Sequence, residues 1–179
     1  MADSKKLVPF ILSWETDKYT NNKYDKGGPT KYGITLATWR KVGYDKNGDG
    51  VLNEEDVKLL TEEDFHRVFK NNFWDACKAD LIIDQSVANM LVDFAYNSGV
   101  GKAVKHLQLV LGITADGIIG NKTLYAINKS NGERLFEAFK KDRKAYLKRI
   151  AVGDQKGFLK GWLRRLSYIM YGNLKLNKR

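Results

Sequence analysis

The sequence predicts a mainly α-helical protein with one short β-hairpin, and three observations support this fold class. Apolar residues recur every three to four positions along most of the 179 residues, which is the period of helices that bury one face. The exception follows the Gly27-Gly28-Pro29 turn, where larger and smaller residues alternate from Tyr32 to Leu36, as they do in a short strand. A hydrophobic content of 43% with only two prolines is typical of an ordered globular chain.

The helices of the first half follow from apolar spacing and from capping residues. A first helix is expected over residues 5–19. Thr35 is a good N-cap for a short helix that ends near Gly43. Thr61 and Asp64 have the spacing of a capping box, in which each side chain bonds the other residue's backbone N–H, so another helix is expected to begin there.

The second half is expected to be helical throughout, with a seam at residues 112–120. The glycine-rich turn 98–101 is expected to end the most apolar helix. We therefore predict a catalytic region over residues 1–111 and a second region over residues 112–179 that packs on it. The helices of this half are expected over residues 84–97, 102–111, 121–127, 130–150 and 158–171.

The composition limits the kinds of partner and cofactor. The 31 basic and 21 acidic residues give a net charge of +10, which favours an acidic partner such as nucleic acid, an anionic membrane or a cell wall. We predict no nucleic-acid partner, because no DNA- or RNA-binding motif accompanies the charge. No apolar run approaches the length of a membrane span. Cys77 is the single cysteine, which excludes an intrachain disulfide and fits a reducing compartment.

Glu15 is the strongest candidate for a catalytic residue. Val8, Ile11, Leu12 and Glu15 fall at i, i+3, i+4 and i+7, so they would share one face of a helix. The Glu15 carboxyl group would then point toward apolar neighbours, and desolvation raises the pKa of a carboxyl group. A general acid that works near neutral pH needs such a pKa. The alternative is that Glu15 only marks the rim of the apolar stripe.

Asp25 and Thr30 follow in the turn after this helix. An acid on a helix, with a second acid and a hydroxyl on a nearby loop, is suited to protonate a leaving group and to position water. Glycoside hydrolysis needs this combination. We therefore interpret Glu15 as general acid, Asp25 as the residue that positions water or stabilises an oxocarbenium-like state, and Thr30 as a residue that orients that water.

Three blocks of the sequence resemble one enzyme family. The first is Glu15 with Asp25-x-Gly27-Gly28-x-Thr30-x-x-Gly33-Ile34-Thr35, the second is Asp116-Gly117-Ile118-Ile119-Gly120, and the third is Lys160-Gly161-Trp162-Leu163-Arg164-Arg165. Together they are similar to glycoside hydrolase family 108, the lysozyme-like N-acetylmuramidases that carry a C-terminal peptidoglycan-binding segment. The family usually has Glu-Gly-Gly-Tyr where this chain has Glu15-Thr16-Asp17-Lys18-Tyr19.

The resemblance implies a lysozyme-like helical fold with the hairpin near the active site. It also implies a peptidoglycan hydrolase that cleaves β-1,4 bonds between N-acetylmuramic acid and N-acetylglucosamine. We expect a monomer with peptidoglycan as its partner and no cofactor for the chemistry. One alternative is a catalytically silent wall-binding protein, and another, from charge alone, is nucleic-acid binding. Because the N-terminus lacks the pattern of a signal peptide, we expect synthesis in the bacterial cytoplasm and action at the wall or periplasm after release.

Four further residues are candidates for substrate binding. Tyr32 and Trp74 carry rings on which a sugar could stack, although any single aromatic residue is more often part of a core. Asp93 and Asn97 are one helical turn apart, and the resemblance places such a pair near the substrate cleft. The alternative for this pair is a buried polar contact that caps the following turn.

Residues 45–56 match the calcium loop of an EF-hand. Oxygen donors occupy the first, third and fifth positions, and Gly50 occupies the sixth, where the loop turns sharply. We therefore predict one structural Ca²⁺, and the alternative is a pair of ordinary Asn-Gly and Asp-Gly turns. The predicted ligands are Asp45, Asn47, Asp49, the Val51 carbonyl, Asn53 and Asp56.

Overall fold

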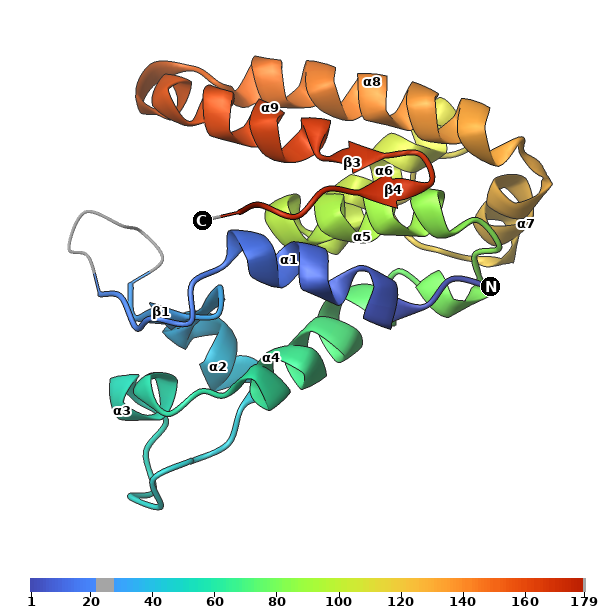
Figure 1. Cartoon of the computed structure of the whole chain (residues 1–179). Helices are drawn as coiled ribbons and strands as arrows, with labels where there is room; N and C mark the ends of the chain where they lie inside the picture. The colour runs from blue at the N-terminus through green and yellow to red at the C-terminus, as the bar shows by residue number, and fades with distance from the viewer. Residues whose placement is uncertain (22–27, 179) are drawn as a thin grey trace.

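The computed structural model describes residues 1–21 and 28–178 and has a mainly α-helical, lysozyme-like fold with two small antiparallel hairpins, which confirms the predicted fold class. The predicted residue Asp25 lies outside the described residues. Figure 1 shows a smaller lobe below and a larger helical lobe above, with α1 between them. The smaller lobe contains β1 (Thr30–Lys31), β2 (Ile34–Thr35), α2 (Leu36–Val42), α3 (Glu54–Lys58) and α4 (Glu62–Phe69).

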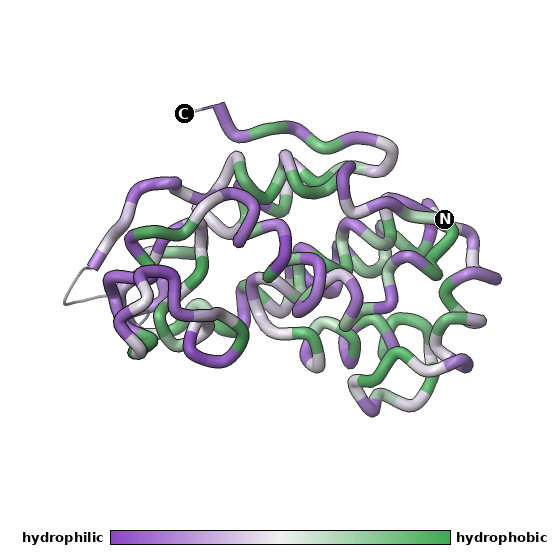
Figure 2. The backbone as a smooth tube through the Cα atoms, turned by 90° about the horizontal axis from the view of Figure 1, so that it is seen from below, coloured by the Kyte–Doolittle hydropathy of each residue, from purple (hydrophilic) through white to green (hydrophobic). Residues whose placement is uncertain are grey.

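The larger lobe is built around α5 (Gln85–Ser98). Ten consecutive residues of this helix, Ser86 to Ala95, are buried, so it forms the centre of the lobe and the other helices surround it. These are α6 (Val100–Val110), α7 (Asn121–Lys129), α8 (Gly132–Ile150) and α9 (Leu159–Ser167), followed by the hairpin of β3 (Ile169–Met170) and β4 (Asn173–Leu174). Along the helices, hydrophilic and hydrophobic residues alternate (Figure 2), as amphipathic packing requires.

The expected helix starts are confirmed where a capping side chain marks them. The Thr35 hydroxyl accepts a hydrogen bond from the Thr38 N–H, and Thr61 forms a complete capping box with Asp64. Asp84 and Asn131 cap α5 and α8 in the same way. These side chains satisfy backbone N–H groups that have no partner inside the helix, so they fix where each helix begins.

The first helix is shorter than the sequence predicts. A 3-10 turn over Ser4–Lys6 precedes α1 (Val8–Trp14), and α1 ends at Trp14, with Glu15 as its C-cap, rather than at residue 19. Glu15 has extended backbone angles, φ −94° and ψ 154°. The chain therefore leaves the helix at Glu15 and continues toward the hairpin formed by β1 and β2.

The segment between α4 and α5 contains a feature that periodicity does not reveal. Residues Lys70–Trp74 form a π-helix, and a short 3-10 helix, Ala79–Leu81, follows. A π-helical turn inserts one residue into the helical ladder, and such turns often occur beside functional sites. In this protein the turn places Phe73 at a hollow next to Glu15.

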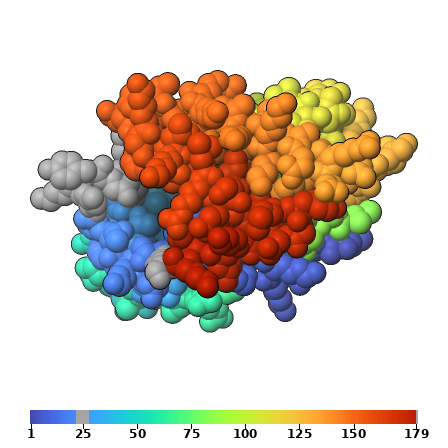
Figure 3. All heavy atoms as spheres, turned by 45° about the horizontal axis from the view of Figure 1, so that its top comes forward, coloured from blue at the N-terminus to red at the C-terminus, as the bar shows by residue number. Residues whose placement is uncertain are grey.

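The C-terminal residues contact two parts of the chain that are distant in the sequence. The Tyr171 hydroxyl donates to the Asp84 carboxylate over 2.8 Å, and the Asn177 N–H donates to the Ser13 hydroxyl over 3.0 Å. Figure 3 shows this segment lying across the molecule between α9 and the N-terminal part. No helix in the described part of the chain is both long enough and apolar enough to cross a membrane.

Candidate active site

Glu15 is the C-cap of α1 and lies just beyond the helix. Its N–H still bonds the Ile11 carbonyl over 3.3 Å. The expected apolar surround is present on one side, where Phe65, Phe69 and Phe73 line a hollow that Glu15 also lines, but a cation contacts the carboxylate as well. The Glu15 carboxylate is 19% exposed, and its Oε1 is 3.2 Å from Nη1 of Arg165 on α9.

Two hollows meet at Glu15. One has a volume of about 380 Å³ and is also lined by Tyr32, Asp17 and Glu62. The other has a volume of about 330 Å³ and is lined by residues from β2, α2, α4, α5 and the π-helix, among them Gly33 and Asn97. Glu15 is therefore the acid placed where an extended ligand would pass from one hollow to the other.

Gly33 and Tyr96 enclose the Glu15 carboxyl group. A Cβ at Gly33 would lie 2.8 Å from Oε2 of Glu15 and 2.2 Å from the Tyr96 hydroxyl, so only a hydrogen side chain fits between them. Burial, followed by the nearby Glu15 charge, raises the pKa of Tyr96. The phenol is therefore neutral near pH 7, and its O–H donates to the Tyr32 carbonyl over 3.5 Å.

This close approach gives a prediction for Gly33→Ala. The methyl group would displace the Tyr96 hydroxyl or the Glu15 carboxylate, and φ +71° at residue 33 is also unfavourable for alanine. We expect turnover to fall about 100-fold, the usual effect of a 1 Å misplacement of a reacting group. Initial rates on purified cell walls, the substrate that the family resemblance implies, test this expectation.

Gly112→Ala is the matched control for Gly33→Ala. Gly112 has a similar φ of +68°, but a Cβ there meets no atom within 4 Å. The control therefore carries the same backbone strain without the contact to Glu15 or Tyr96. Equal losses in the two variants would contradict the positioning role of Gly33.

Arg165 belongs to a buried ionic network that extends from Glu15 into the core. Its Nε and Nη2 donate to Oδ1 of Asp93 over 3.0 and 2.8 Å. Nη2 of Arg143, on α8, lies 2.7 Å from Oδ2 of the same carboxylate. Asp93 is fully buried, and the side chain of Arg143 is 3% exposed. Two carboxylates and two guanidinium groups therefore form a charge-balanced quartet that connects α1, α5, α8 and α9.

The quartet determines the charge of its central carboxylate. Burial of Asp93 acts against ionisation, but the charges of Arg165 and Arg143 outweigh it and hold the pKa of Asp93 below its usual range. Asp93 therefore stays ionised at neutral pH. The two arginines are held in place by this charge, and Arg165 in turn holds the Glu15 side chain.

The structure brings some of the predicted site residues together and separates others. Tyr32 and Asn97 each line a hollow beside Glu15. Thr30 lines neither hollow, and its hydroxyl donates to the Gly28 carbonyl over 2.8 Å.

Trp74 is fully buried and donates through its ring nitrogen to Asp80, so the prediction that its ring stacks on a sugar is wrong. Asp93 is a buried partner of arginines, so its predicted contact with substrate is also wrong.

Several residues of the site have no strong signal in the sequence. Arg165 lies 150 positions from Glu15, and only its place in the Gly-Trp-x-x-Arg-like block marks it. Tyr96 belongs to α5, and packing alone explains the spacing of apolar residues along this helix. Nothing in the sequence therefore marks Tyr96 as a site residue. Asp17 and Glu62 add two further carboxylates to the first hollow.

The predicted calcium loop gathers most of its proposed ligands. One oxygen of the Asp49 carboxylate lies 2.9 Å from the Asn47 amide nitrogen and 3.1 Å from that of Asn53. The Asp45 carboxylate accepts backbone N–H groups at positions 48 and 50 over 2.7 Å each. The Asp49 side chain therefore contacts both asparagines, while the Asp45 carboxylate bonds the backbone of the same loop.

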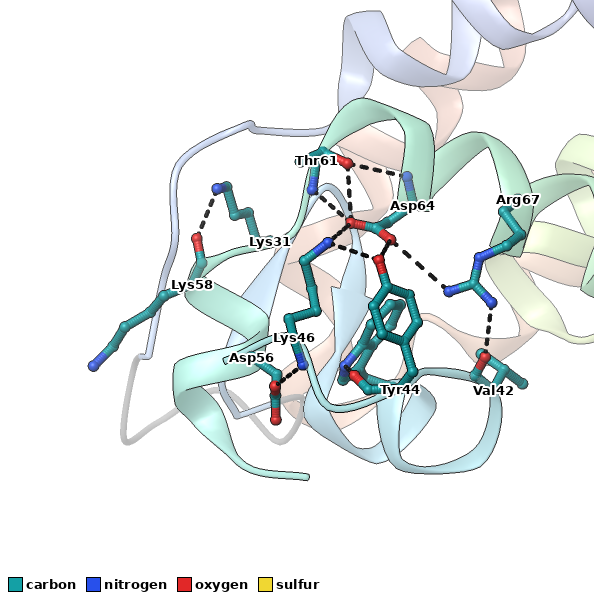
Figure 4. A network of polar contacts seen from close by, with 10 residues as sticks. Lys31, Val42, Tyr44, Lys46, Asp56, Lys58, Thr61, Asp64 and Arg67 are labelled. Atoms are coloured by element: carbon teal, nitrogen blue, oxygen red, sulfur yellow. Dashed lines mark hydrogen bonds and ion pairs between the residues drawn. The ribbon is translucent and has the colours of Figure 1, made fainter. Parts of the chain in front are cut away.

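Asp56 has a role that the loop pattern does not predict. It is fully buried, and its two oxygens accept the N–H groups of Lys46 and Asn53 over 2.6 and 2.9 Å. Figure 4 shows Asp56 beneath Lys46, whose ammonium group pairs with Asp64 over 2.6 Å. Asp56 thus caps α3 and closes the base of the loop. Within the described ranges, no group of three or more His, Cys, Asp or Glu side chains is arranged to hold a metal ion.

Comparison with known proteins identifies the family. The model of glycosyl hydrolase 108 matches residues 8–99, and that of a predicted peptidoglycan domain matches residues 102–167. This chain belongs to the glycosyl hydrolase 108 family. The solved structure of Brucella abortus SagA is 32% identical, with a TM-score of 0.78 over 98% of this chain and 95% of that one. No curated protein matches the sequence. The two family matches support a peptidoglycan-related glycoside hydrolase, with peptidoglycan as the partner.

Proposed function

We propose that this family member is an N-acetylmuramidase, with Glu15 as the general acid for cleavage of the β-1,4 bond after N-acetylmuramic acid. The observation that carries the proposal is the place of Glu15, where two hollows meet and where Gly33 lets the hairpin backbone approach the carboxyl group. A glycan that occupies both hollows would bring one glycosidic oxygen to this acid.

The chemistry divides between the proton donor and the groups around it. Glu15 donates its proton to the leaving oxygen, which cannot depart as an alkoxide near neutral pH. Arg165 positions the carboxyl group and stabilises the carboxylate that forms after proton transfer. We propose that Asp25 positions the attacking water or stabilises the positive charge on the sugar, with help from Thr30 as the sequence predicts.

Analysis of digested walls tests the bond specificity. Purified peptidoglycan treated with the protein should release muropeptides with N-acetylmuramic acid at the new reducing end, as read by mass spectrometry after borohydride reduction. Fragments that end in N-acetylglucosamine would contradict the muramidase proposal. Binding to walls without new reducing ends would instead favour the catalytically silent wall-binding protein.

We also propose that the loop at residues 45–56 binds one Ca²⁺. Hydrogen bonds join four of the predicted ligand side chains to one another or to the backbone of the loop, and Ca²⁺ takes six to eight oxygen ligands in flexible geometry. Because an ion that binds only the folded state stabilises it, saturation at roughly 100 times the dissociation constant would add about 2.7 kcal/mol to the free energy of unfolding. Calorimetric titration and a melting curve of chelator-stripped protein measure both effects.

Asp49→Asn is the matched control for calcium binding. It keeps the size of the central side chain and removes its charge, so we expect weaker binding and a smaller rise in Tm. A melting curve of the wild-type protein that does not move with calcium would show that the loop is a pair of ordinary turns.

A further inference from the structure

A third pocket lies on the α8 and α9 side of the site, and its most polar lining residues are Arg143 and Arg165. Its volume is about 100 Å³, and we call it the arginine pocket. Asn97 lines both this pocket and the hollow beside Glu15. Arg165 lines the arginine pocket and also contacts Glu15. The arginine pocket is therefore next to the hollow that Glu15 lines, so one ligand could reach both.

Arg143 has donors that the folded protein leaves unused. Arg165 directs all three of its guanidinium nitrogens at Asp93 or Glu15. Arg143 has one ion pair with Asp93, and its Nη1 meets only the Met90 sulfur at 3.6 Å, which is a weak acceptor. Among the described residues its Nε is buried without a hydrogen-bond partner. Arg143 lines the arginine pocket, so a guanidinium group with few internal acceptors lies at the wall of that pocket.

The charges around the pocket favour an anion as its ligand. Asp93 is shared between two arginines, so Arg143 has only part of a counter-charge. When Glu15 carries the proton that a general acid needs, the other three members of the quartet have a net charge of +1. An anion in the pocket would restore neutrality. A planar guanidinium binds carboxylates well, because its donors match the geometry of the two oxygens.

We propose that the arginine pocket binds a carboxylate of the lactyl–peptide side chain that peptidoglycan strands carry. The other walls of the pocket are the side chains of Leu147, Ile150 and Trp162, which suit the short aliphatic groups next to such a carboxylate. This inference rests on the proposed muramidase function and extends it, because it assigns recognition of the acidic side chain to α8 and α9. Neutral glycans lack the group that the pocket recognises.

Equilibrium titrations with three small ligands test the pocket apart from turnover. The ligands are N-acetylmuramic acid, a muramyl peptide with a free carboxylate, and N-acetylglucosamine as the neutral sugar. We expect at least one acidic ligand to bind about tenfold or more tightly than the neutral sugar, as a charge-assisted hydrogen bond would give. The tighter of the two acidic ligands identifies the source of the carboxylate. Equal affinities for all three would overturn the proposal.

Two kinds of variant localise the effect. Arg143→Met removes the donor and leaves Asp93 paired with Arg165, so the preference for acidic ligands should disappear. Ser98→Asp places a carboxylate at the lining of the pocket and should also abolish the preference, whereas the isosteric Ser98→Asn should retain it. If Ser98→Asp and Ser98→Asn behave alike, the carboxylate does not bind in this pocket. A failure of wall cleavage would overturn the muramidase proposal alone, because these titrations measure binding without cleavage.

Discussion

Glu15→Gln is expected to lower the rate of cell-wall lysis by about two to four decades, the usual contribution of general acid–base catalysis. Glutamine keeps the size of the side chain and an oxygen that can accept from Arg165, but it has no proton of suitable acidity to donate. The substitution therefore removes the chemistry while the contacts of the residue remain. Initial rates of wall solubilisation over a range of protein concentrations measure the loss.

The fold should tolerate this substitution. Arg165 keeps both of its hydrogen bonds to Asp93, so the quartet loses one partly exposed charge and no buried partner. We expect circular dichroism spectra and melting curves close to those of the wild-type protein. Glu63→Gln is a suitable control, because Glu63 is exposed and lines neither hollow. If Glu15→Gln dissolves walls at nearly the wild-type rate, Glu15 is not the acid.

Local signals made most of the fold predictable from the sequence. Thr35, Thr61 and Asp84 each cap a helix by bonding N–H groups two or three residues ahead. Because both partners are close in the sequence, the pattern is sufficient to place the helix start. The hairpin formed by β1 and β2 is predicted only in outline. The alternation of large and small residues indicates one strand from Tyr32 to Leu36, whereas Tyr32 and Gly33 form the turn of the hairpin and Leu36 begins α2.

The site depends on contacts that no local pattern encodes. Helical spacing points to Glu15, yet the helix ends before it, and Arg165, 150 positions away, contacts its carboxylate. Asp93 and Trp74 are buried, although their residue types are also common in binding sites. Tertiary packing decides such cases, because burial depends on which helices meet. The π-helix over Lys70–Trp74 is a further example, because the spacing of apolar residues in the sequence does not reveal its extra residue.

Asp93→Asn is expected to destabilise the protein by about 3–5 kcal/mol, the usual cost of removing one partner from a buried ion pair. The wild-type quartet contains two positive and two negative groups. Without the Asp93 charge, Arg143 is buried beside a second guanidinium with no carboxylate of its own. A loss of this size corresponds to a fall in Tm of roughly 6–20 °C for a chain of this length. Thermal unfolding at pH 7 measures it.

Asp142→Asn is the control for Asp93→Asn. Asp142 is next to Arg143 on α8 and pairs with His106, but its side chain is 30% exposed. Because loss of this pair leaves no fully buried charge without a partner, this variant should melt closer to the wild-type temperature than Asp93→Asn does. Comparable losses in the two variants would show that α8 is sensitive to any change of charge rather than to the buried quartet.

The pH dependence of this loss follows from the depressed pKa of Asp93. The two arginines hold that pKa, against the effect of burial, below the value of about 3.9 found in unfolded chains. Between these two values the folded state binds fewer protons than the unfolded state, so stability decreases as the pH falls. The contribution of the Asp93 charge to the free energy of unfolding is fully present above about pH 4 and is lost as the pH falls through the folded-state pKa.

The difference in unfolding free energy between wild type and Asp93→Asn should therefore be constant from pH 7 to pH 5 and should shrink in stronger acid. A difference that stays constant into stronger acid, where Asp93 becomes protonated, would show that the carboxylate charge is not what stabilises the quartet.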